Sequence, residues 1–173
     1  MWWYTNLMLL LPVLFLLHDF EEAIVLPSWM KRNRAELERN VPIFKNRFLK
    51  RLFSVTTERF MLMVTEEFLI FTGITLYAYF YHAYYLWFAA FAAFSLHLIV
   101  HFIQALVLRR YVPSLITSLI SLPYCIYMFV RTSQLELFTV KQMVIYAAAG
   151  FAVGLVNLLL IHIIFSGKSE DAR

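Results

Sequence analysis

The sequence predicts an all-α protein, a polytopic transmembrane helical bundle with about five membrane helices. Its 173 residues are 62% hydrophobic and only 15% charged, which is far more apolar than a soluble domain. Five apolar segments are each long enough to cross a hydrocarbon core, which needs about 20 helical residues. The segments lack the alternation of β-barrel strands, and a helix satisfies its backbone hydrogen bonds internally. Helices are therefore the expected elements.

The predicted helices form a single transmembrane domain that covers residues 1–173. They lie near residues 2–26, 60–80, 84–108, 112–130 and 138–165. The first segment begins with Trp2, Trp3 and Tyr4, which are typical of aromatic interface anchors, and no small-residue cleavage site follows, so we expect a retained helix. In the last segment Gly150 and Gly154 form a G-x-x-x-G motif, which permits close helix packing within the bundle or in a homodimer.

Basic residues lie mainly on one side of the predicted membrane. Nine of the 15 lysines and arginines fall between Lys31 and Arg59, and with five crossings four more lie on the same side. Only Arg131 and Lys141 lie opposite. By the positive-inside rule the amino terminus is outside and the carboxyl terminus is cytoplasmic, in the inner (plasma) membrane. The net charge of +4 therefore reports topology, and we expect no nucleic-acid partner.

Residues 28–54 form a basic cytoplasmic loop, the only sizeable soluble segment of the predicted topology. Within it, apolar residues at near-helical spacing alternate with lysines and arginines. These apolar residues are Phe44, Phe48, Leu49 and Leu52. The pattern is typical of an amphipathic helix that lies on the anionic lipids of the inner leaflet. The alternative is a charged loop that only sets the orientation.

The segment LFLLHDFEEAIVLP, Leu14–Pro27, places one histidine and three acids in a sequence otherwise compatible with lipid. A charged side chain at the centre of a membrane helix costs roughly 2.5–3.5 kcal/mol, so such residues are rare and usually functional. Because apolar residues flank the acids on both sides, we expect them to be buried; the alternative is a span that ends at Leu17, with His18–Glu22 among the lipid headgroups. Glu21 and Glu22 follow His18 by three and four residues, which projects all three from one helical face. Asp19 is expected to turn to the side.

A second polar pair, His97 and His101, is spaced four residues apart in the third predicted helix. This spacing allows two histidines to bind one metal ion. In an apolar helix they can also be core residues that are hydrogen-bonded to neighbouring helices. Counted from the helix ends, His18, Glu66, His101 and His162 all lie about 9–13 Å deep. Four helices would therefore bring histidine or glutamate to one level in the inner half of the bilayer.

The negative charge of acidic side chains at that level must be neutralised, and the predicted helices carry no lysine or arginine there. A divalent metal ion is the strongest available partner, with protons and the histidines as alternatives. The candidate metal ligands are His18, Glu22, Glu66, His97, His101 and His162. The candidate catalytic acids are Glu21, Glu22 and Glu67. This set suffices for one ion with a spare glutamate base or for two ions, and it does not distinguish zinc, iron and manganese.

The segment HDFEE, His18–Glu22, resembles the signature of the HXXEE-domain proteins, small bacterial and archaeal membrane proteins named for this motif. The resemblance extends over most of the chain, with a Glu-Glu pair in the second helix and the His-x-x-x-His in the third, followed by a Tyr-x-Pro turn at Tyr111–Pro113. It implies a presumed enzyme without an established reaction. The positions it supports are His18, Glu21 and Glu22, followed by Glu66, Glu67, His97 and His101.

Two classes of function remain open. One is a metal-dependent enzyme, a hydrolase or oxidoreductase, that acts on a lipid or another lipophilic small molecule entering from the surrounding membrane lipids. The other is a proton or divalent-ion transporter or relay that uses the same residues, with a non-catalytic scaffold as a third possibility. Outside the predicted layer the polar groups are few, chiefly Asn6, Thr72, Thr75 and Ser121. This distribution favours a site that is accessible from one side of the membrane only. We therefore expect an enzyme.

Overall fold

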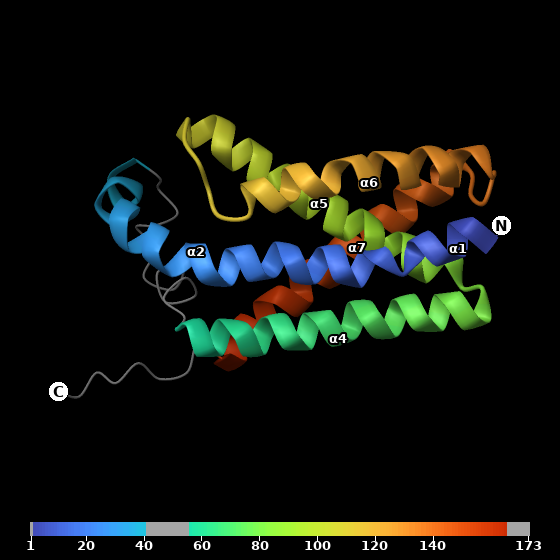
Figure 1. Ribbon diagram of the computed structural model, residues 1–173, viewed down its shortest axis with the longest axis horizontal. Coiled ribbons are helices and arrows are strands. Elements are labelled where there is room, and N and C mark those ends of the chain that lie inside the picture. The colour runs from blue at the N-terminus through green and yellow to red at the C-terminus, as the bar shows by residue number, and fades with distance from the viewer. Residues whose placement is uncertain (1, 41–55, 166–173) are drawn as a thin grey trace.

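The computed structural model of the protein describes residues 2–40 and 56–165, and these residues are helical with no strand (Figure 1). The helices are α1 (Trp2–Met8), α2 (Leu10–Asn40), α4 (Thr57–Tyr81), α5 (Tyr84–Leu108), α6 (Leu115–Gln134) and α7 (Val140–Phe165). Within this part of the chain, α4, α5, α6 and α7 are each long and apolar enough to cross a membrane. The all-α membrane bundle predicted from the sequence is confirmed. Helix α2 is not among these four helices, because its apolar stretch contains three acidic residues.

The first predicted helix is divided at Leu9, where α1 ends and α2 begins. Proline at position 12 explains the break, because Pro12 has no N–H to donate to the carbonyl of Met8 and its ring crowds that carbonyl. The indole Nε1 of Trp87 in α5 donates a hydrogen bond to the Met8 oxygen instead, at 3.3 Å. The break is therefore stabilised by a side chain from a neighbouring helix.

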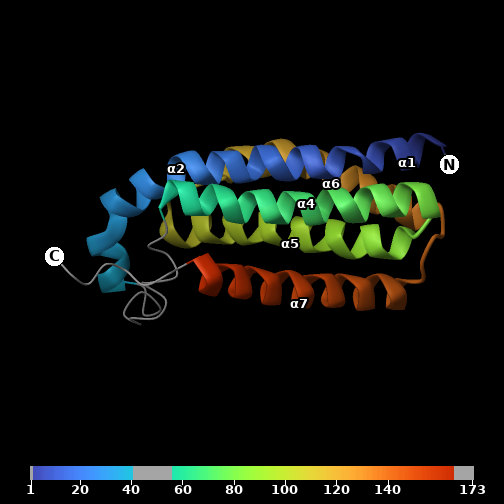
Figure 2. The same cartoon turned by 90° about the horizontal axis from the view of Figure 1, so that it is seen from below.

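Helix α2 continues well beyond the predicted end near residue 26, so residues 28–40 are helical where a loop was expected. Pro27 lies inside the helix, and the last part of α2 bends away from the long axis of the bundle (Figures 1 and 2). A proline removes one backbone hydrogen bond, which bends a helix that other contacts hold. Here Trp29 donates to the carbonyl oxygen of Tyr111 at 2.9 Å. The predicted amphipathic segment around Phe48 lies outside the described residues.

For the other helices, the predicted and the observed bounds differ by a few residues at the ends. Helix α5 has the predicted bounds, and α4 and α7 differ from theirs by up to three residues. Helix α6 begins at Leu115 rather than 112, because Pro113 interrupts the chain and Ser114 adopts a left-handed conformation with φ of 63°. This turn places the first residues of α6 beside α2.

Four helices form a ring in which α2 packs on α4, α4 on α5, α5 on α6 and α6 on α2. Helix α7 lies outside the ring and packs mainly on α5, as Figure 2 shows from below. The interior is filled largely by aromatic side chains. Those that are fully buried include Tyr4, Trp87, Phe88 and Phe91. Helices α2 and α5 therefore face each other across the ring, and any polar group between them lies inside the bundle.

The close packing of α7 on α5 depends on Gly150. A Cβ atom at this position would lie 2.1 Å from the carbonyl oxygen of Ala89, so only glycine permits the contact. A Cβ at Gly154 would lie 4.0 Å from the Cβ of Ala93, an ordinary contact distance. The G-x-x-x-G motif is thus used within the chain, and a homodimer stays a prediction.

Candidate metal centre

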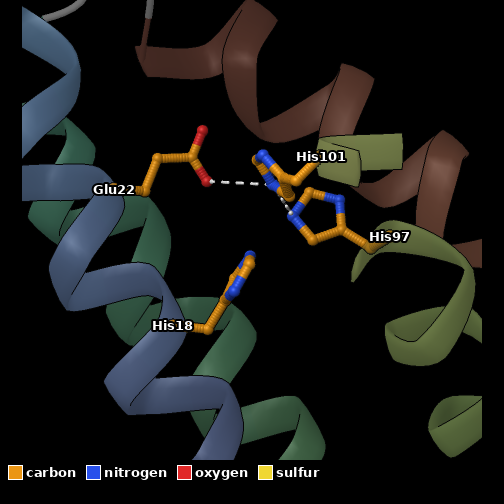
Figure 3. A group of neighbouring side chains, drawn as sticks. All are labelled: His18, Glu22, His97 and His101. Atoms are coloured by element: carbon orange, nitrogen blue, oxygen red, sulfur yellow. Dashed lines mark hydrogen bonds and ion pairs between the residues drawn. The ribbon is translucent and has the colours of Figure 1, made fainter. Parts of the chain in front are cut away.

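Four side chains meet in the interior of the ring: His18 and Glu22 from α2, and His97 and His101 from α5 (Figure 3). Each offers one ligand atom, and these four atoms all lie within 4.8 Å of one another. His18 and His101 are buried, and Glu22 and His97 are half-buried. All four belong to the ligand set predicted from the sequence. We call these four residues the His/Glu group, and its geometry can hold a metal ion.

The two histidines of α5 come closest to the geometry of a metal site. Their Nε2 atoms are 3.1 Å apart. Two nitrogens bound to one zinc ion at about 2.0–2.1 Å each lie about 3.3 Å apart at a tetrahedral angle. Glu22 Oε2 lies farther out, 4.0 Å from Nε2 of His101. In the structure these two nitrogens share a hydrogen bond, and the same separation would suit two nitrogens bound to one ion, with the Glu22 carboxylate next to them.

His18 contributes a nitrogen that lacks a partner. Its side chain is 0% exposed, and its Nε2 has no hydrogen-bond partner among the residues that the structure describes. The ring points toward the other two imidazoles, with centroid distances of 5.1 Å to His97 and 4.9 Å to His101 (Figure 3). A buried polar atom without a partner costs about 1–3 kcal/mol, and a metal ion would satisfy it.

Glu21 makes its hydrogen bonds to the start of α6, and it also interacts electrostatically with His101 of the His/Glu group. Its carboxylate accepts hydrogen bonds from the backbone N–H of Thr117 at 2.8 Å and from the Thr117 hydroxyl at 2.7 Å. Ser114, the residue that precedes α6, makes no side-chain cap, so Glu21 of α2 satisfies the first free N–H groups of α6. The sequence placed Glu21 and Glu22 on one face with His18, but the two acids contact different neighbouring helices.

A family model described as "Protein of unknown function with HXXEE motif" matches residues 9–128. The chain belongs to this family. The match contains the whole His/Glu group and confirms the resemblance seen in the sequence. No curated protein and no solved structure shows significant similarity to the chain.

The first glutamate of the HXXEE motif is also bound by Tyr111, whose hydroxyl donates to Glu21 Oε1. Tyr111 lies between α5 and α6, outside the membrane-spanning helices. Partial burial and the hydrogen bond to Glu21 raise the pKa of Tyr111 to about 12. The phenol is therefore a protonated donor at neutral pH and helps to hold the Glu21 carboxylate at the amino-terminal end of α6.

The remaining predicted site residues lie outside the His/Glu group. Glu66 of α4 accepts a hydrogen bond from Asn157 of α7 at 3.2 Å. His162 Nδ1 contacts the carbonyl oxygen of Leu158, in its own helix, at 2.9 Å. Glu67 interacts electrostatically with Glu22, the last residue of the HXXEE motif. The predicted layer of four helices is thus narrower in the structure, where α2 and α5 supply the ligand atoms.

Some residues around the HXXEE motif were not anticipated. Asp19 is only 6% exposed and interacts electrostatically with Glu22 and Glu67, although the sequence suggested that it turns aside. Thr117 contacts both His18 and Glu21, at 3.3 and 2.7 Å. A threonine in an apolar helix carries no distinctive signal, and the depth of Asp19 depends on where α4 packs. Neither position could be assigned before the helices were placed.

An aromatic layer closes the His/Glu group on the side toward α1. Phe94 lies edge-on to the His18 ring at a centroid distance of 5.8 Å. Phe15 stacks on Phe71 at 4.4 Å and contacts Phe94 at 6.1 Å. These three phenylalanines come from α2, α4 and α5, so the layer spans the interior of the ring. The polar groups of the HXXEE motif therefore lie on one side of an apolar barrier.

Proposed function

We propose that this HXXEE protein is a membrane-embedded, metal-dependent enzyme that acts on a lipophilic or lipid substrate. In this proposal the three imidazoles of His18, His97 and His101 hold one divalent ion, and Glu22 lies next to its open position. The main support is that four potential ligand atoms lie within 4.8 Å of one another, and that Nε2 of His18 has no hydrogen-bond partner in the part of the chain that the structure describes. Catalytic zinc sites commonly have three protein ligands and a water molecule.

The chemistry follows from the positions of the chain's own groups. A bound ion of the zinc type lowers the pKa of a coordinated water to about 7. Glu22 Oε2 lies 4.0 Å from Nε2 of His101, so Glu22 would be the carboxylate beside such an ion and would serve as the general base. Glu67 of α4 lies near enough to Glu22 to interact with it electrostatically. The phenylalanine layer excludes water from one side.

The same layer favours an enzyme over a transporter. An ion that crossed the bundle would have to pass Phe15, Phe71 and Phe94 and then a core of further aromatic rings. Access is therefore expected from the side away from α1. Most basic residues flank that end, so we place it in the cytoplasmic half of the inner membrane. The outer surfaces of these helices are apolar and would lie in lipid, so we expect a substrate that dissolves in lipid.

Cobalt substitution tests the proposed coordination. The protein is purified in detergent without a histidine tag, stripped with a chelator and titrated with Co²⁺. We expect saturation near one ion per chain and the intense visible bands of a four-coordinate site, which azide shifts by occupying the open position. Glu22→Gln should still bind the ion, because the three imidazoles remain. Failure to bind Co²⁺, or a spectrum indifferent to azide, would contradict the proposal.

Lipid turnover and ion flux separate the two functions. Metal-loaded protein and the Glu22→Gln variant are each incubated with a total membrane lipid extract, and the products are compared by mass spectrometry. We expect one lipid class to be consumed by the wild type alone. In parallel, proteoliposomes that contain a zinc-sensitive dye should show no influx above empty vesicles. Zinc influx that is lost in Glu22→Gln, without lipid turnover, would favour the transporter.

A further inference from the structure

We infer that Thr117 and Glu21 are positioning residues that hold the His18 imidazole in a single tautomer, with its proton on Nδ1 and the Nε2 lone pair directed into the His/Glu group. The inference deepens the proposed function and rests on it, because its consequence is the orientation of one metal ligand. It assigns the first glutamate of the HXXEE motif a role distinct from that of the second.

The Thr117 hydroxyl decides the tautomer because it has only one proton to donate. Its Oγ1 lies 2.7 Å from Glu21 Oε2, 3.3 Å from His18 Nδ1 and 3.3 Å from the carbonyl oxygen of Ser114. The carboxylate is both the nearest acceptor and the charged one, so it receives the proton. Toward His18 the hydroxyl oxygen can then only accept. Nδ1 of His18 must therefore carry the ring proton, which leaves Nε2 as an acceptor.

The unpartnered state of Nε2 agrees with this assignment. A protonated Nε2 would be a buried donor without an acceptor among the described residues. An unprotonated Nε2 is instead a lone pair, the form in which a neutral imidazole binds a metal ion. Metal-binding histidines generally donate their other ring N–H to an oxygen acceptor that fixes the tautomer and the ring orientation. Here a threonine hydroxyl relays that interaction to a carboxylate.

Glu21 is itself held rigidly by the start of α6. It accepts hydrogen bonds from the backbone N–H groups of Thr117 at 2.8 Å and Ile116 at 3.4 Å, and from the Tyr111 hydroxyl. The amino-terminal end of a helix favours a negative charge, which keeps this carboxylate a strong acceptor. Ser114 Oγ also donates to the backbone oxygen of His18 at 3.1 Å. The same turn therefore positions both the backbone and the ring of His18.

The spacing of the HXXEE motif accounts for the two roles. Consecutive residues of a helix point about 100° apart, since one turn contains about 3.6 residues. Glu21 consequently contacts α6, while Glu22 faces His101 of α5 at 4.0 Å. One glutamate orients the histidine and the other lies beside the ligand atoms.

An isosteric pair of variants tests the relay. Thr117→Val keeps the shape of the side chain and removes the hydroxyl, whereas Thr117→Ser keeps the hydroxyl. We expect Thr117→Val to lower the affinity for Zn²⁺ by about 10–100-fold, the usual effect of losing an outer partner of a metal ligand. Thr117→Ser should stay close to the wild type. Affinity is measured by competition with a chromophoric chelator, and melting temperature shows that each variant is folded.

The tautomer itself is observed in the metal-free wild type by nitrogen NMR of ¹⁵N-histidine-labelled protein, with His18 assigned through a His18→Gln sample. A single Nδ1–H form is the expected result, and an Nε2–H form overturns the inference whatever the variants do. If the wild type binds Zn²⁺, equal Zn²⁺ affinity of Thr117→Val and Thr117→Ser also overturns it. An Nδ1–H form in a protein that binds no metal supports the positioning role and refutes the proposed function, so the two fail separately.

Discussion

Replacing His101 with alanine is expected to abolish tight metal binding. His101 Nε2 lies 3.1 Å from His97 Nε2 in its own helix and 4.0 Å from Glu22 Oε2 in α2, so it lies between the candidate ligands of the two helices. Its loss leaves two imidazoles on opposite helices and no short nitrogen pair. Zn²⁺ affinity should fall by more than about 100-fold, beyond the range for the loss of an outer partner.

The matched control is His162→Ala. His162 was predicted as a ligand at the same depth, but it contacts the Leu158 carbonyl oxygen of its own helix and lies outside the His/Glu group. Metal content per chain is measured by elemental mass spectrometry after dialysis against a weak chelator, with tag-free protein. We expect the His162→Ala protein to retain the ion and the His101→Ala protein to lose it. Equal retention in both variants would remove the basis for the metal centre.

The second large effect is expected at Gly150, where alanine should destabilise the bundle. The added Cβ would lie 2.1 Å from the Ala89 carbonyl oxygen, and this partner is backbone that cannot rotate away. Helix α7 must therefore shift from α5. Overpacking of this kind typically costs about 1–3 kcal/mol, partly offset by the better helix propensity of alanine, worth up to about 1 kcal/mol. The net effect on the free energy of unfolding is a loss of stability.

Gly154→Ala is the matched control for this prediction. The new Cβ would meet the Ala93 Cβ at 4.0 Å, an ordinary contact, so the variant should be as stable as the wild type or slightly more stable. Both proteins are unfolded in mixed micelles with increasing dodecyl sulfate and followed by circular dichroism. If Gly150→Ala unfolds at the same denaturant fraction as Gly154→Ala, the close contact between α5 and α7 does not hold in the membrane protein.

Much of the candidate site could be predicted from local spacing. The four-residue interval between His97 and His101 sets both rings on one side of α5, whatever the helix packs against. The interval between His18 and Glu22 does the same for α2. The depth of each pair, counted in residues from the helix end, then predicted that both pairs lie at the same level in the membrane. Glu66 and His162 satisfied the same count, but depth does not specify rotation about the helix axis, and both point elsewhere.

The sequence by itself determined the all-α membrane class and the family, and it included the four residues of the His/Glu group among its six candidate ligands, because apolar length and helical periodicity are properties of one segment at a time. Only the tertiary structure decided which segments meet. In the structure Glu21 contacts α6, Glu22 faces α5, and Thr117 lies against His18. Helix α2 also continues past Pro27 and ends at Asn40. These outcomes depend on side chains from different helices, whose relative rotation follows from the packing of the whole ring.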